Sequence, residues 1–68
     1  MSETTDRLVY MANQIARNFA AQGEETAIAA TTEHIRLFWD PRMRAAIMKA
    51  DQSALNPIAS VAVKMLSA

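Results

Sequence analysis

The side chains that most often carry enzyme chemistry are sparse in this chain. His34 is the single histidine, and the 68 residues include no cysteine and one glycine. A nucleophilic triad needs a histidine beside a serine or cysteine and a third group that orients it, whereas His34 lies at the edge of an expected apolar face. Metal sites need several converging ligands, and phosphate loops need several glycines. We therefore expect no catalytic, cofactor-binding or metal-binding residue here, and a chain that is not an enzyme by itself.

The basic side chains are the next candidates for a binding role. Residues 35–50 carry Arg36, Arg42, Arg44 and Lys49 against one acid, while residues 1–34 carry five acids against two arginines. The formal net charge is zero, which argues against a nucleic-acid-binding protein. The uneven charge fits either ordinary solvated helix faces or a basic patch that meets an acidic partner. Arg42 and Lys49 are expected to share one helix face, with Arg44 far around the same helix.

Several large apolar side chains fall outside the helix stripes that are expected to form the core. They are Tyr10, Leu37, Met48 and Val63. Either a second packed side of a helix buries them, or they form an exposed interface patch. Trp, Tyr and Arg are also common interface anchors. The predicted partner-binding residues are therefore Tyr10, Leu37, Trp39, Arg42, Met48 and Lys49.

Helical periodicity organises the whole sequence into one expected domain, residues 1–68. The predicted fold is all-α, a small array of four helices over about residues 5–22, 25–39, 41–50 and 57–66. Gly23 is placed to end the first helix, whose opposite side carries Asn13 and Arg17. The expected buried stripes are Leu8, Met11, Ala12, Ile15 and Phe19; Ile28, Thr31, Ile35, Phe38 and Trp39; Met43, Ala46, Ile47 and Ala50; and Ile58, Val61, Ala62 and Met65.

A sharp corner is predicted between the second and third helices. Pro41 disfavours a helical conformation at Asp40 and suits the first turn of a new helix, for which Asp40 is a good N-cap. Arg36 and Arg44 each lie four residues from Asp40, so either one could pair with its carboxylate. Asp40, Pro41 and Arg44 are the predicted structural residues of this corner.

The chain has no apolar run near the ~20 residues that span a bilayer. Its first residues, Met-Ser-Glu-Thr-Thr-Asp, are polar and acidic, unlike a signal peptide. We expect a soluble cytoplasmic protein without membrane contact.

Three motifs resemble one family. In order along the chain they are Met11-Ala-Asn-Gln-Ile15, His34-Ile-Arg-Leu-Phe-Trp-Asp-Pro-Arg-Met-Arg44 and Leu55-Asn56-Pro57. In this order they resemble the motifs of the delta subunit of NAD-dependent, molybdenum-containing formate dehydrogenases. The resemblance covers nearly the whole chain. Ala16 stands where that family often has glycine, as do the residues just before Leu55.

The resemblance implies a small accessory subunit of a cytoplasmic complex that oxidises formate to carbon dioxide and reduces NAD. It implies a hetero-oligomer in which a large catalytic subunit holds a molybdenum or tungsten pterin cofactor and iron–sulfur clusters. Further subunits would hold FMN and more clusters, and this chain would support assembly or stability. Two alternatives stay open: a small helical nucleic-acid-binding or regulatory module, suggested by the tight basic corner, and an assembly chaperone that acts transiently.

Overall fold

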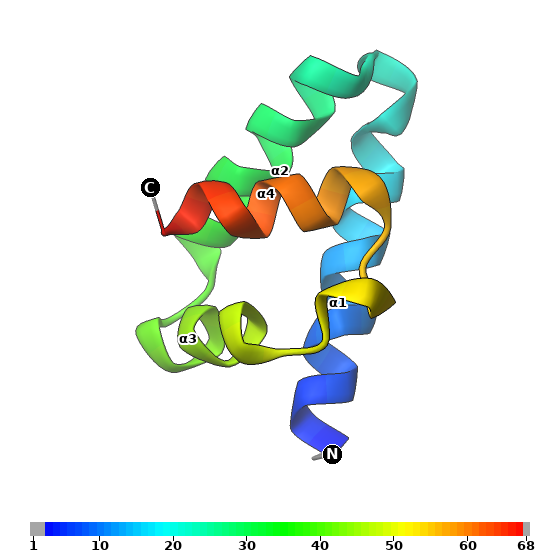
Figure 1. Ribbon diagram of the computed structural model, residues 1–68. Coiled ribbons are helices and arrows are strands. Elements are labelled where there is room, and N and C mark those ends of the chain that lie inside the picture. Colours follow the sequence, from blue (N-terminus) through cyan, green and yellow to red (C-terminus); the bar gives the residue numbers. More distant parts are fainter. Residues whose placement is uncertain (1–2, 68) are drawn as a thin grey trace.

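The computed structural model describes residues 3–67, and its regular structure is all helical (Figure 1). The α-helices are α1 (Glu3–Phe19), α2 (Glu24–Phe38), α3 (Pro41–Lys49) and α4 (Pro57–Leu66). Two short 3-10 helices, η1 (Ala20–Gln22) and η2 (Gln52–Ala54), lie in the connections before α2 and α4. The all-α prediction is confirmed, and α2, α3 and α4 match their predicted ranges within about one residue.

Gly23 separates α1 from α2. The backbone there has φ 99° and ψ 150°, in the region that glycine reaches without steric cost. Its N–H donates to the Ala20 carbonyl at 3.2 Å, and its carbonyl accepts from the Ala27 N–H at 2.8 Å. The one glycine therefore ends η1 and begins α2 at the same residue.

The helices cross rather than run side by side. Figure 1 shows α1 along the length of the molecule, with α4 crossing it and α3 beside its N-terminal part. α2 packs mainly on α4 and α1, and α3 packs on α1 and α4. The principal extents are 32 × 20 × 17 Å, so every helix has one side on a thin shared core and another side at the surface.

The core is built largely from small side chains. All four α-helices contribute, and Ile35 and Ile47 are its largest fully buried aliphatic residues. Alanines at the contacts let helix backbones approach closely, but each contributes little apolar area. The buried cluster comprises Leu8, Ala12, Ala16, Ile35, Trp39, Ile47, Leu55, Ala59 and Val63.

The predicted stripe of α4 is partly wrong. Val63 was expected off the stripe and is only 2 % exposed, whereas Val61 and Met65 were expected inside and are 39 % and 47 % exposed. Ala62 is buried as predicted, and Ala59 faces the core beside Val63. The start of α4 is fastened to α1 by hydrogen bonds, which fix the rotation of the helix in a way that its own periodicity does not encode.

Asn13 makes that attachment. Its Oδ1 accepts from the Asn56 N–H at 2.8 Å, its Nδ2 donates to the Ala54 carbonyl at 3.0 Å, and its carbonyl accepts from Asn56 Nδ2 at 3.2 Å. The expectation that Asn13 faces away from the packed side of α1 is therefore wrong. Asn13 ties the middle of α1 to the junction of η2 and α4.

Candidate docking surface

The corner between α2 and α3 follows its predicted chemistry. Asp40 is extended, with φ −74° and ψ 168°, and its Oδ1 accepts from the Met43 N–H at 2.9 Å. Pro41 is the first residue of α3, where its missing N–H costs no hydrogen bond. Two extended residues, Trp39 and Asp40, thus redirect the chain between the helices.

Arg44 closes the corner through carbonyl groups rather than through Asp40. Its Nη1 donates to the carbonyls of Trp39 at 2.8 Å and Arg36 at 3.1 Å. The last carbonyls of a helix lack intrahelical partners and carry the negative end of its dipole, so a guanidinium suits them. The expected pairing of Arg36 or Arg44 with the Asp40 carboxylate is not formed, because Arg44 caps α2 and Arg36 caps α4.

Trp39 lies in the core. It is 4 % exposed and belongs to the buried cluster with Ile35 and Ile47. Its backbone N–H donates to the Ile35 carbonyl at 2.9 Å, so Trp39 is the last hydrogen-bonded residue at the end of α2. The indole therefore anchors the corner from inside the core. Little of it is left at the surface for a partner to contact.

The exposed aromatic at the corner is Phe38. This residue was expected inside, but it is 71 % exposed, and the adjacent Leu37 is 68 % exposed. Phe38 lies on the same sector of α2 as Ala27 and Thr31, and burial along that sector falls from these two through half-buried His34 to Phe38. Within residues 3–67, no helix covers Phe38 at the end of this sector. The same side of α2 is therefore buried at the start of the helix and exposed at its end.

The rings of His34 and Phe38 pack against each other in a tilted arrangement. Their ring centroids are 4.8 Å apart and the rings are inclined by 43°. This contact joins successive turns of α2 and limits how Phe38 can turn. We call Leu37, Phe38 and the half-buried His34 the α2 tip.

The basic residues Arg42 and Lys49 share a face, as predicted. With Thr5, Ala45 and Ala46 they line a shallow hollow of about 440 Å³ on α3. Small alanines between two cations leave room for a partner backbone to approach. This face lies on the helix that follows the α2 tip across the corner.

The other predicted docking residues lie elsewhere. Met48 borders a hollow of about 300 Å³ with Gln52, Val63 and Lys64. Tyr10 is exposed on α1, where its hydroxyl accepts from Gln14 Nε2 at 3.1 Å. The structure thus brings Arg42 and Lys49 together but does not gather all the predicted residues at one site.

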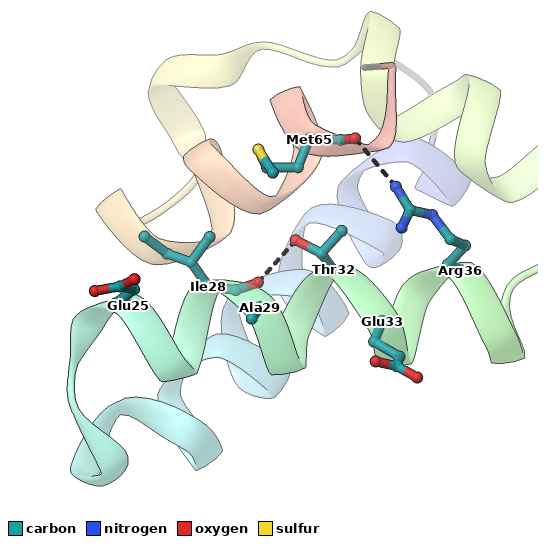
Figure 2. A pocket seen from close by; sticks show the side chains of 7 residues that line it. All are labelled: Glu25, Ile28, Ala29, Thr32, Glu33, Arg36 and Met65. Carbon is teal, nitrogen blue, oxygen red and sulfur yellow. Dashed lines mark hydrogen bonds between the residues drawn. The ribbon is translucent and has the colours of Figure 1, made fainter.

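A groove between α2 and α4 was not predicted. It measures about 430 Å³ and is lined by Glu25, Ile28, Ala29, Thr32, Glu33, Arg36 and Met65 (Figure 2). Arg36 Nη2 donates to the Met65 carbonyl at 3.2 Å and the Thr32 hydroxyl donates to the Ile28 carbonyl at 2.7 Å. The groove exists because the rotation of α4 leaves Met65 at the surface and not in the predicted buried stripe. The periodicity of the α4 sequence alone does not give that rotation.

Metal-ligating side chains do not converge within residues 3–67. In this range no group of three or more His, Cys, Asp or Glu side chains could hold a metal ion.

The pKa of Asp51 is lowered because its carboxylate accepts from the Ser53 hydroxyl at 2.6 Å and N–H at 3.0 Å, and these bonds cap η2. Over residues 3–67 no helix is long and apolar enough to cross a membrane.

Comparison with known proteins identifies a family. The family model for the NADH-dependent formate dehydrogenase delta subunit FdsD matches residues 7–63. No curated protein and no solved structure matches significantly. The match contains the three motifs noted above, and Asn13, Asp40, Pro41, Arg44 and Asn56 within them hold the fold together.

Proposed function

Because this chain belongs to the family of NADH-dependent formate dehydrogenase delta subunits, we propose that it is a non-catalytic accessory subunit. It docks on the large catalytic subunit of a cytoplasmic hetero-oligomer and supports assembly or stability of the active enzyme. The complex oxidises formate to carbon dioxide and reduces NAD through groups that other subunits hold.

The chemistry of the chain supports a role without a cofactor of its own. Iron–sulfur clusters are held by cysteine thiolates, and the sequence has no cysteine. The residues of the chain therefore do not fit such a cluster. We assign the molybdenum or tungsten pterin cofactor, the iron–sulfur clusters and FMN to the other subunits.

The observation that carries the docking proposal is the exposure of Leu37 and Phe38 at the α2 tip. Two adjacent large apolar side chains in water are costly for a chain with so small a core. Burying them against a partner removes that cost and stabilises the fold at the same time. Across the corner, Arg42 and Lys49 add a basic face that suits acidic residues of the partner.

The nucleic-acid-binding alternative is weakened by the position of Arg44. Its Nη1 is engaged by two carbonyls at the corner, so it does not join Arg42 and Lys49 in a phosphate-binding row. Binding to DNA would show a steep dependence on salt concentration. We expect no such binding.

The experiment compares two double variants in the complete complex. Leu37→Ser with Phe38→Ser removes the apolar surface of the α2 tip, and Ala21→Ser with Gln22→Ser changes exposed residues of η1 as a control. We expect the first variant to be lost when the complex is purified through its large subunit, and formate-dependent NAD reduction to decline. The control variant should co-purify with the complex and keep activity.

Two results would contradict the proposal. Stoichiometric retention of the Leu37→Ser/Phe38→Ser chain with full activity would show that the α2 tip does not dock. Absence of the unaltered chain from the mature complex would instead indicate a transient assembly chaperone.

A further inference from the structure

The groove between α2 and α4 has apolar walls at the surface of the molecule. Ile28 and Ala29 come from α2, and Met65 comes from α4 (Figure 2). Val61 is 39 % exposed one turn before Met65 on the same side of α4. The thioether of Met65 adapts to differently shaped partners because it has several rotatable bonds.

The groove is lined by more acidic than basic side chains. Glu25 and Glu33 lie on its α2 side and are exposed. Arg36, the groove's basic residue, donates to the Met65 carbonyl at 3.2 Å, which holds the guanidinium at the end of α4. The groove therefore combines apolar walls with an edge that carries two acids against one base.

The length of the groove suits a short helix. Glu25 and Arg36 are eleven positions apart on α2, which corresponds to about 16 Å, or three helical turns. Such a groove receives an amphipathic helix through apolar side chains spaced three or four residues apart. Acidic residues along the edge select basic residues beside them.

We propose that this groove binds a short amphipathic helix of another subunit of the complex, with apolar anchors flanked by lysine or arginine. The inference rests on the proposed function, since it takes the partner from the same hetero-oligomer. It adds a second contact, on a different part of α2 from the tip, and gives that contact a distinct chemistry. The chain would then hold its partner through two surfaces of different chemistry: the acidic groove, and the α2 tip with the basic face of α3 beside it.

The test places arginine at two exposed positions of one helix. Ala29→Arg fills the groove and opposes the expected basic residues, whereas Thr26→Arg adds the same side chain outside the lining of the groove. We expect Ala29→Arg to weaken retention of the chain in the purified complex about tenfold, as for loss of one interface anchor. Thr26→Arg should be retained like the unaltered chain. Equal retention of both variants would overturn the groove proposal while leaving the proposed function intact.

A charge variant and a cross-link complete the test. Glu25→Lys with Glu33→Lys should also weaken retention, while circular dichroism should show that the free chain keeps its helicity. A photo-reactive residue at position 29 in the assembled complex should cross-link to a helical segment of another subunit that carries lysine or arginine. A cross-link to a second copy of this chain, to an acidic segment or to no protein would overturn the proposal.

Discussion

At the scale of single residues, the motifs that carry the family resemblance hold residues of two kinds. Asn13 fastens α1 to the start of α4, Asp40 caps α3, and Arg44 caps α2. In the same run of residues 34–44, Leu37 and Phe38 are exposed at the α2 tip. We therefore assign Asn13, Asp40 and Arg44 to the fold, and Leu37 and Phe38 to the proposed contact.

Substituting Asn13 tests this view. Asn13→Ala should lower the free energy of unfolding by about 2 kcal/mol, because it leaves the half-buried N–H of Asn56 and the Ala54 carbonyl without their partner. Asn13→Asp should cost less, since it keeps an acceptor for the Asn56 N–H. Urea denaturation followed by circular dichroism measures both variants. Asn18→Ala, at an exposed position of the same helix, is the control, and an equal loss there would contradict the role of Asn13.

Substituting Thr31 should stabilise the fold, whereas substituting Asn13 should destabilise it. The Thr31 side chain is fully buried, and its Oγ1 has no hydrogen-bond partner among residues 3–67. A buried hydroxyl without a partner costs about 1–3 kcal/mol relative to a satisfied one, and valine has nearly the same shape. Thr31→Val should therefore raise the midpoint of urea denaturation. Thr32→Val is a matched control that should not stabilise, because the Thr32 hydroxyl donates to the Ile28 carbonyl; a lower midpoint for Thr31→Val would show that its hydroxyl finds a partner.

At the scale of the elements, side chains from outside the helix close the C-terminal ends of α2, α3 and α4. Arg44 caps the end of α2, Gln52 donates to the Ile47 and Ala50 carbonyls at the end of α3, and Arg36 caps α4. Terminal carbonyls otherwise lack partners. These contacts set the angles between successive helices, because each cap reaches a neighbouring segment.

The corner provides the third prediction. Arg44→Ala should destabilise the fold by about 1–2 kcal/mol, since hydrogen bonds from a guanidinium are stronger than neutral ones and the site is half-buried. Arg44→Lys should recover part of this, because one ammonium does not reproduce the guanidinium fork. Arg42→Ala, exposed on the same helix, should change stability by less than about 0.5 kcal/mol. If Arg44→Ala and Arg42→Ala had equal effects on thermal unfolding, Arg44 would not secure the corner.

The sequence predicted the positions of the helices better than their rotations. Gly23, Asp40-Pro41 and Asn56-Pro57 act locally, so the helix ends could be read from neighbouring residues. The rotation of α4 depends on a bond to Asn13, 43 positions away in sequence. The exposure of Phe38 depends on where neighbouring helices stop covering α2. For the same reason the sequence identified Arg42 and Lys49 as one face but missed the groove, which two helices form only after packing.

At the scale of the whole molecule, a thin core is accompanied by a large set of exposed apolar side chains. Alanines fill many helix contacts, so little apolar area is buried per residue. Tyr10, Leu37, Phe38, Met48, Val61 and Met65 remain at the surface. Small domains without disulfides or metals commonly gain stability by oligomerisation. Both proposed contacts, the α2 tip and the groove, would bury part of this set.

The last prediction concerns the isolated chain. Its free energy of unfolding should lie well below about 5 kcal/mol, the lower end for stable domains, with a broad thermal transition by circular dichroism. Within the complex, binding stabilises the folded form by mass action, so hydrogen exchange of α2 and α4 amides should be far slower than in the free chain. The two docking surfaces predict that slowing should be greatest for α2, which contributes to both. A sharp, highly stable transition of the free chain, or equal exchange of α2 in the two states, would contradict partner-dependent stability.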